Sequence, residues 1–277
     1  MNPVTFSTLA CPDWSIQTIV EKAVEFGYAG IEWRGGLQGH VQPAMPNSVK
    51  TALKKMTQEA GLIPLAVTAY TSFISPDAEE RQSNVEELRH YCELAAELGA
   101  RYVRAFIGEL PPETELDPGL HGVISDCLSM ASEYADSLDV RIAVEPHDDF
   151  ARSSAVHPIL EGSHPNLSVI WDIGNAFAAG EDPAEGFELL KDRLAYVQVK
   201  DGIRNQSSWQ LCPLGQGQVP LNRAFQLLLS CGYQGALSVE WEYAWHLELD
   251  PPGTALPAAL QHIQNILADI HLNRSPR

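Results

Sequence analysis

Basic residues are scarce in this sequence of 277 residues: 18 Lys and Arg stand against 36 Asp and Glu, and the net charge is −18. A nucleic-acid partner needs a basic surface that neutralises phosphates, and an anionic membrane attracts the same kind of surface, so the charge argues against both partners. No apolar run approaches the ~18 residues of a membrane span. The N-terminal residues also lack the pattern of a signal peptide, so we expect none.

Cysteine is rare as well, with five residues spread from Cys11 to Cys231 and no C-x-x-C pair. An odd number at wide spacing fits neither a disulfide framework nor a zinc-finger pattern. A reducing compartment is the simplest explanation, so we expect a cytoplasmic protein. Hydrophobic residues make up 45% of the chain, which is enough to bury a core and excludes a disordered protein.

A recurring junction organises the chain. A Gly directly follows a helix-like segment, and a β-rich run comes next, in FGYAGIEW (26–33), LGARYVRAF (98–106) and CGYQGALSVEW (231–241). Gly favours the position after a helix because it adopts the left-handed conformation without a Cβ clash. The repeated junction therefore predicts repeated αβ units.

Eight strands and eight helices are expected to alternate along the chain. We predict strands at 4–10, 29–34, 62–69, 101–107, 140–145, 167–172, 195–200 and 236–241. We predict helices near 15–26, 46–60, 77–98, 119–138, 152–162, 183–193, 220–231 and 254–271. In the third helix Ser75 is the expected cap and Pro76 the first helical residue.

This alternation predicts a parallel sheet, and eight units predict a single (β/α)₈ TIM barrel that takes up residues 1–277 as one domain. The alternative is an open doubly wound sheet. That fold carries a glycine-rich phosphate loop after its first strand, where this sequence reads ACPDWS (10–15).

Acidic and polar residues follow four successive predicted strands. Glu145 ends the fifth, Asp172 the sixth and Glu240 the eighth, while Gln198 lies in the seventh. The spacings from Glu145 to Asp172 and from Asp172 to Gln198 are each close to one βα unit. The side chains should therefore meet at the C-terminal mouth of the barrel, where barrel enzymes keep their active sites. By strand alternation, Trp171 and Trp241 should point outward into the core.

Three carboxylates in one barrel mouth would repel each other unless a positive charge lies among them. A divalent cation would provide it, and the oxygens of Glu145, Asp172, Glu240 and Gln198 suit Mn²⁺ or Mg²⁺, with Co²⁺ and Zn²⁺ as alternatives. The other interpretation is a salt-bridge network in which Arg34, Arg104 and Lys200 replace the metal.

Seven motifs in register resemble the xylose isomerase-like barrels of the sugar phosphate isomerase/epimerase group. They are FSTLACPDWS, GYAGIEWR, VEPHDDF, WDIGNAF, VQVKDG, PLGQGQVPL and LSVEWEY. The resemblance covers nearly the whole chain. It implies a metal-dependent barrel enzyme and leaves the substrate open.

Carried over residue by residue, the resemblance places Glu145, Asp172, Gln198 and Glu240 at the four metal-ligand positions. In epimerases of the family the two glutamates also exchange protons with the substrate carbon. Arg204 falls where relatives often place a substrate-contacting Arg, and Asn175 falls where His is frequent. The main departure is Gln198, because the usual motif has His there, and an amide is a weaker, harder ligand than imidazole. PLGQGQ also lacks an acid that relatives carry between its glycines.

We expect five residues to bind substrate: His147, Asn175, Lys200, Arg204 and Arg104. His147 lies two residues beyond Glu145, towards the mouth. It could also be an ordinary hydrogen-bonded loop histidine, and Lys200 could simply balance charge. Substrate identity should depend on the loops around Trp14, His40, Tyr70, Phe73 and Trp245.

The leading functional prediction is a metal-dependent isomerase or epimerase of a small polyhydroxy ketone that works through a cis-enediolate. A dehydratase of the inosose type would use the same site, with His147 as the acid for the leaving hydroxyl. A non-catalytic sugar-binding barrel is the alternative from another class, because His is missing at position 198. The sequence leaves a homo-oligomer open.

Overall fold

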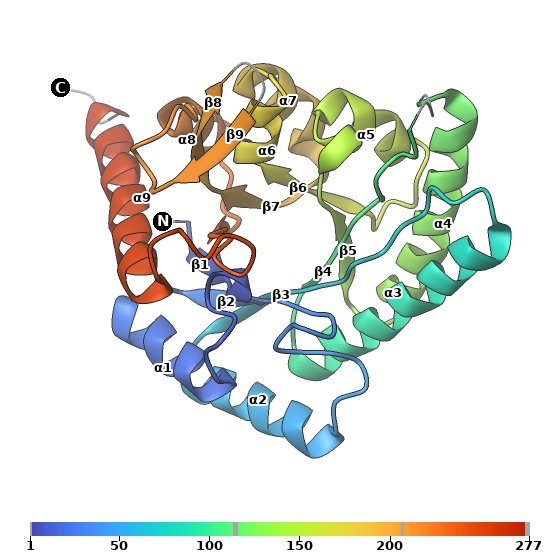
Figure 1. Ribbon diagram of the computed structural model, residues 1–277, viewed down its shortest axis with the longest axis horizontal. Helices are drawn as coiled ribbons and strands as arrows, with labels where there is room; N and C mark the ends of the chain where they lie inside the picture. The colour runs from blue at the N-terminus through green and yellow to red at the C-terminus, as the bar shows by residue number, and fades with distance from the viewer. Residues whose placement is uncertain (1, 113–115, 206–207, 275–277) are drawn as a thin grey trace.

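The computed structural model describes residues 2–112, 116–205 and 208–274, and it shows a closed barrel of parallel strands with helices around it (Figure 1). The order around the barrel is β1-β10-β7-β6-β5-β4-β3-β2. The barrel strands are β1 (Val4–Ser7), β2 (Gly30–Trp33), β3 (Ile63–Thr68), β4 (Tyr102–Ala105), β5 (Arg141–Val144), β6 (Ser168–Asp172), β7 (Leu194–Val199) and β10 (Leu237–Val239). The predicted (β/α)₈ barrel is confirmed.

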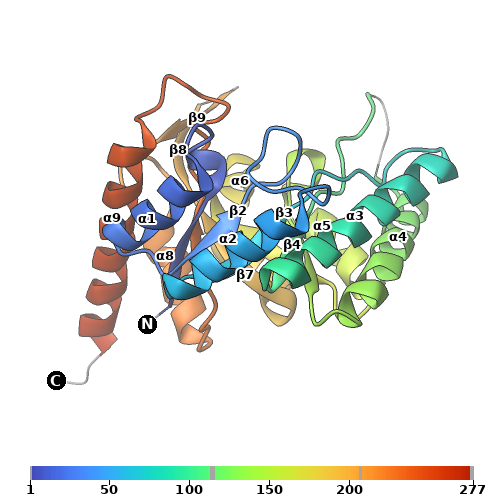
Figure 2. The same ribbon diagram turned by 90° about the horizontal axis from the view of Figure 1, so that it is seen from below.

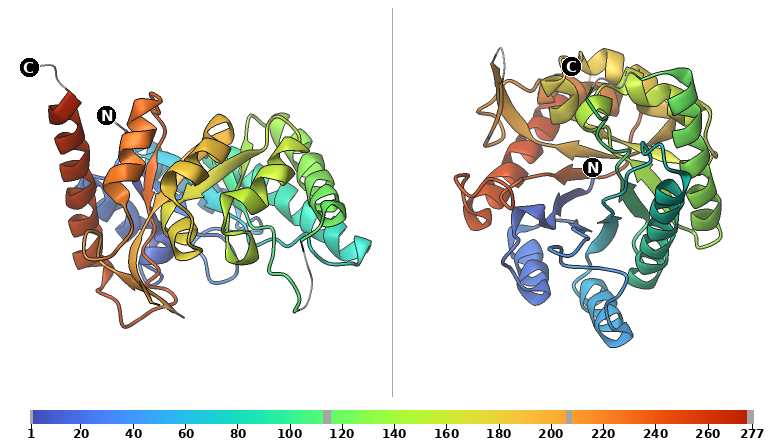
Figure 3. Two further views of the ribbon diagram at one scale, coloured as in Figure 1. Left: turned by 90° about the horizontal axis from the view of Figure 1, so that it is seen from above. Right: turned by 45° about the vertical axis from the view of Figure 1, so that its right-hand side comes forward.

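Helices follow the strands and cover the outside of the barrel (Figures 1 and 3). They are α1 (Ile16–Phe26), α2 (Asn47–Glu59), α3 (Ala78–Leu98), α4 (Pro118–Asp136), α5 (Ser153–Glu161), α6 (Ile173–Ala178), α7 (Pro183–Leu190), α8 (Leu221–Ser230) and α9 (Pro252–Arg274). Within the described residues, none of these helices is long and apolar enough to cross a membrane.

Three local features differ from the sequence expectations. The short helix α6 directly after β6 was not predicted. Neither was the antiparallel hairpin of β8 (Asp201–Asn205) and β9 (Ser208–Cys212), which lies in a segment expected to be a loop. Residues 206–207 of that segment lie outside the described residues. At the start of α3 the cap is Asp77 rather than Ser75, because the Asp77 carboxylate accepts the Glu79 N–H at 2.8 Å.

The loops that follow the strands project on one side of the barrel. Figure 2 shows the β8–β9 hairpin, the loop after β2 and the segment after β4 rising together, while the end of α9 lies on the opposite side. Active sites of such barrels occupy the side where the strands end. The fold therefore gathers the predicted site residues on the loop side.

Side chains alternate between the two faces of each strand, so the layer between strands and helices and the inside of the barrel receive different side chains. The outward side chains pack between strands and helices, and they include Trp171 and Trp241, at 1% and 5% exposure, as predicted. Inside the barrel a small apolar cluster, with Tyr102, Ile170 and Tyr196 among its members, forms a separate group. Polar and charged side chains from the same strands share the barrel interior with this cluster.

A register shift between β6 and β7 positions two of the site residues. Val169 pairs with Leu194, but Ile170 pairs with Tyr196, so one extra residue of β7 is accommodated. Because of this shift Asp172 lies beside Gln198 rather than beside Val197. Neighbours in a parallel sheet point to the same face, so the irregularity brings the Gln198 amide next to the Asp172 carboxylate.

Close contact between β2 and β3 gives a test of the barrel packing. A Cβ added at Gly30 would lie 2.2 Å from the Ile63 carbonyl oxygen, so Gly30→Ala should cost about 1–3 kcal/mol through overpacking. The control Gly122→Ala lies on an exposed part of α4 with no atom within 4 Å, and should gain about 0.5–1 kcal/mol from helix propensity. Urea unfolding followed by circular dichroism measures both. A Gly30→Ala midpoint equal to that of the parent would contradict the packing.

Candidate active site

Four neighbouring strands supply the predicted metal ligands. Glu145 follows β5, Asp172 ends β6, Gln198 lies in β7 and Glu240 follows β10. Each is at most 4% exposed. One ligand oxygen from each of the three acids lies within 4.8 Å of the other two, so the structure brings them together as one buried triad.

Asp172 is held by the helix that begins with it. Its Oδ1 accepts the N–H of Asn175 at 2.8 Å and so caps α6. This hydrogen bond ties Oδ1 to the helix and leaves Oδ2 for the other groups of the site. The Asn175 amide lies 3.4 Å from Glu145 Oε1, so the structure places Asn175 against a carboxylate of the triad.

Lys200 is the buried cation among the acids. Its ammonium lies 2.9 Å from Asp172 Oδ2, 2.7 Å from Glu240 and 2.8 Å from Glu242, and its side chain is 2% exposed. Arg104 from β4 pairs with Glu145 at 2.6 Å. These are two of the three cations in the salt-bridge alternative. The third, Arg34, instead donates to Tyr70 and to the Gln38 carbonyl.

Glu32 fixes the orientation of the Gln198 amide and was not singled out in the sequence. The Gln198 Nε2 donates to Glu32 at 3.0 Å and to Glu240 at 3.3 Å. Both partners are carboxylates, so the nitrogen must face them and the oxygen must face away. Glu32 is itself fully buried and accepts from the hydroxyls of Tyr196 and Ser238. The sequence offered one signal for Glu32, because a charged residue is unusual within an otherwise apolar strand such as GIEW (30–33).

Burial and neighbouring charges shift the pKa values of the acids in different directions. Burial raises the pKa of Asp172 to about 8 and that of Glu32 to about 7, and it raises the pKa of Glu145 despite Arg104. Burial also pushes the pKa of Glu240 upward, but Lys200 outweighs it and the pKa falls below its usual value. With these two cations, the pKa values of Asp172 and Glu32 lie near neutral pH, while the pKa of Glu240 stays below its usual value.

The donor set fits a divalent cation. Within the described residues Gln198 Oε1 is buried without a hydrogen-bond donor, and Asp172 Oδ2 has the Lys200 ammonium at 2.9 Å as its partner. Buried oxygens normally have a partner. Three carboxylates and an amide oxygen are ligands that hard cations such as Mg²⁺ and Mn²⁺ accept.

A cavity of about 330 Å³ opens beside the triad. Its acidic lining residues are Glu145, Glu240 and Glu242. A continuous stack also borders it, which we call the arginine wall: Trp245, Arg34, Tyr70, Arg104, Phe106 and His147, all of which line the cavity except Arg34. Each member contacts the next through a ring, a guanidinium or a hydroxyl, at distances from 3.3 to 4.9 Å.

His147 lies in this cavity, as the spacing predicted. Its ring packs 4.8 Å from that of Phe106, and its Nδ1 lies 2.8 Å from Asp148. Burial lowers the pKa of His147, but Glu145 and Asp148 outweigh that effect and the pKa rises above its usual value. His147 is thus placed where it can hold and release a proton near the acids.

Some residues expected at the substrate site lie elsewhere. Arg204 is exposed on β8, where its guanidinium donates to the Phe177 carbonyl at 3.1 Å, and it does not line the cavity. Phe73 is fully buried in the core, and Trp14 packs against Phe26. Of the expected loop positions, Tyr70 and Trp245 line the cavity.

The PLGQGQ loop has a structural explanation in Asp201. The buried Asp201 carboxylate accepts four backbone N–H groups, from Gly202, Gly215, Gly217 and Val219, at 2.8–3.1 Å. A Cβ at Gly217 would lie 2.1 Å from that carboxylate, so the loop needs glycine there. Because Asp201 directly follows Lys200, these four hydrogen bonds also hold the backbone next to Lys200 in place.

Comparisons with known proteins agree on one family. The family model described as xylose isomerase-like TIM barrel matches residues 20–266. Fructoselysine 3-epimerase of Escherichia coli O157:H7 is 23% identical over 239 residues, which cover 81% of this chain and 85% of that protein.

Solved structures share the fold. An L-ribulose 3-epimerase superimposes with a TM-score of 0.82 at 17% identity, covering 100% of this chain and 99% of the other. The IOLI protein with a bound zinc atom gives a TM-score of 0.79 at 18% identity, with coverage of 97% and 99%.

The Gln198 geometry predicts a change in metal preference. Gln198→His should tighten Zn²⁺ and Mn²⁺ binding by at least about tenfold, because an imidazole is the better ligand and Glu32 can accept its other N–H. Calorimetric titration measures the affinities. Gln58→His, on the exposed face of α2, controls for an added surface histidine. Unchanged affinity would mean that position 198 does not face the metal.

Proposed function

Because the chain belongs to the xylose isomerase-like TIM barrel family, we propose that it is a divalent-metal-dependent isomerase or epimerase of a small polyhydroxy ketone. Relatives and structural neighbours named as epimerases support the reaction class. The observation that carries the proposal is the buried triad beside a cavity large enough for a small sugar. The ligands would be Glu145, Asp172, Glu240 and the Gln198 oxygen.

The two glutamates are the proposed bases. Glu145 follows β5 and Glu240 follows β10, with β6 and β7 between them, and both line the cavity. Arg104 holds Glu145 and Lys200 holds Glu240, so each carboxylate is fixed by a cation from another strand. One glutamate would take a proton from the carbon beside the ketone, and the same or the other glutamate would return it after a cis-enediolate.

The remaining polar groups would orient the substrate. Lys200 and His147 lie close enough to the acids to hold substrate oxygens, and His147 can move a proton between them. A bound divalent ion, with Mn²⁺ or Mg²⁺ favoured by the oxygen donors, would supply polarisation of the substrate carbonyl. Asn175 was expected to bind substrate, and its amide, 3.4 Å from Glu145 Oε1, would also position that carboxylate.

A dehydratase is the second candidate because of His147. A raised pKa keeps this imidazole available as an acid in the cavity. It could protonate a hydroxyl that leaves from the carbon next to the enediolate. Loss of water from a candidate substrate, followed by mass spectrometry, separates a dehydratase from an isomerase.

Metal binding is the direct test of the proposal. Mn²⁺ at about 100 times its Kd should raise the melting temperature by about 5–10 °C, because the ion binds only the folded protein. Calorimetry should give one site. Asp172→Asn should abolish most of the shift, whereas Asp182→Asn, at the N-cap of α7 and outside the triad, should keep it. No shift and no heat with the parent protein would refute the metal site.

The two glutamates can be separated by isotope exchange. Glu145→Gln and Glu240→Gln preserve size but remove the base, so turnover should fall by about 10²–10⁴-fold. Both variants are assayed with enough Mn²⁺ to restore full occupancy, and exchange of substrate hydrogen with deuterated solvent is followed beside product formation.

The exchange pattern reports the mechanism. A two-base epimerase keeps exchange on one face in one variant while inversion is lost. A one-base isomerase keeps exchange when the spectator glutamate is changed. Turnover at the parent rate in both variants would show that neither glutamate is the base.

A further inference from the structure

The Arg104 guanidinium has hydrogen-bonding capacity that the proposed mechanism does not use. Its Nη1 donates to Glu145 at 2.6 Å. Its Nε and Nη2 are buried, and no acceptor for either lies within the part of the chain that the structure describes. The side chain is 4% exposed and lines the cavity. A buried N–H without an acceptor is costly, so this edge of the guanidinium calls for a ligand.

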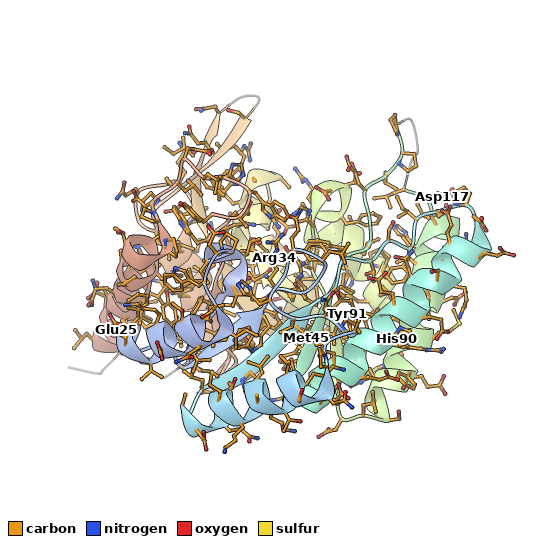
Figure 4. The ribbon with its side chains drawn as sticks, turned by 60° about the horizontal axis from the view of Figure 1, so that its bottom comes forward. Glu25, Arg34, Met45, His90, Tyr91 and Asp117 are labelled. Carbon is orange, nitrogen blue, oxygen red and sulfur yellow. The ribbon has the colours of Figure 1, made fainter. Side chains whose placement is uncertain are left out.

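The arginine wall holds this edge in place. The Phe106 ring lies 3.9 Å and the Tyr70 ring 4.9 Å from the guanidinium carbon, and Glu145 fixes the opposite corner. Stacking and ion pairing prevent the side chain from turning to satisfy its own N–H groups. Arg34, in the same wall, lies over the Trp245 ring and donates to Tyr70, so a second buried guanidinium adds positive potential beside the first. Arg34 is buried, and in Figure 4 it lies between the labelled residues Glu25 and Asp117.

The free edge matches a planar carboxylate. Nε–H and Nη2–H point in parallel from one side of the guanidinium, and this fork binds two carboxylate oxygens at once. A phosphate has a further oxygen that also needs a donor, whereas the groups stacked against this guanidinium are the Phe106 and Tyr70 rings. The ketone end of the substrate would then face the triad, whose Glu145 pairs with the other corner of the guanidinium.

We propose that Arg104 recognises a carboxylate on the substrate, so that the enzyme acts on a sugar acid or a related polyhydroxy keto acid. This proposal rests on the proposed function, because the ketone is placed at the triad. It narrows the proposed function to one class of substrate.

Three matched ligands test the recognition. D-fructose, D-fructuronate and D-fructose 6-phosphate differ only at carbon 6, which belongs to a hydroxymethyl group, a carboxylate or a phosphorylated hydroxymethyl group, respectively. Calorimetry with the Mn²⁺-loaded protein should give about 10- to 100-fold tighter binding of D-fructuronate than of D-fructose, as expected for a charged hydrogen-bonded pair. Equal or weaker binding of the acid, or a stronger preference for the phosphate, would overturn the proposal.

Arg104→Lys keeps the charge but removes the fork of two parallel N–H groups. The ratio of the affinity for D-fructuronate to that for D-fructose, which is the acid preference, should therefore fall to near one, while Mn²⁺ affinity is largely retained. Arg223→Lys is the matched control, because its guanidinium pairs with Asp182 and does not line the cavity, and it should keep the preference. A preference that persists in Arg104→Lys would mean that the carboxylate binds the metal or Lys200 instead.

Two further readouts keep the test decisive. If Arg104→Lys does not fold, the ratio of the two affinities in the parent protein still decides between acid and neutral ligand. Chelation of the metal should leave an acid preference in place, because Arg104 makes its hydrogen bonds without the ion. Failure of Mn²⁺ to bind the parent would refute the proposed function and not this inference.

Discussion

Burial of acidic side chains inside the barrel is the constraint on which the site depends. Glu32, Glu145, Asp172 and Glu240 come from different strands and are each at most 4% exposed. Such charges are tolerated only when they are paired and hydrogen-bonded. Lys200, which follows β7, therefore links the ends of β6 and β10, and Arg104 links β4 to the residue after β5, through ion pairs between neighbouring parts of the barrel. The same pairs orient the carboxylates for a cation or a substrate.

Much of the fold could be predicted from the sequence because the junctions are local. Glycines such as Gly27 and Gly99 have positive φ at the ends of their helices, as the helix–Gly–strand pattern indicated. The β8–β9 hairpin and helix α6 were missed because they interrupt the regular αβ alternation. The extra residue in β7 was missed because a register shift depends on pairing with β6 and leaves no mark on spacing.

The acids of the site were predictable for the same reason, since each lies near the end of a strand. The roles of Glu32 and Arg104 were harder to infer. Glu32 acts through contacts with Tyr196, Gln198 and Ser238, which are far away in sequence. Which edge of Arg104 remains free depends on Glu145, on the Tyr70 ring from the segment after β3 and on the Phe106 ring two residues further along the chain from Arg104. Both roles depend on contacts that exist only once the barrel has formed, so the sequence alone did not reveal them.

The cavity contains a buried cation that the net charge of the chain conceals. The surplus of acids would repel an anionic substrate at long range, but screening confines that effect to about 10 Å at ordinary salt. Inside the cavity the nearest charges decide, and there the Arg104 guanidinium shares the lining with Glu145 and Glu240 and pairs with Glu145 through one corner only. A substrate with a ketone at one end and a negative charge at the other would bind in one direction only. Orientation of the reacting carbon between Glu145 and Glu240 would then follow from electrostatics at the remote end of the substrate.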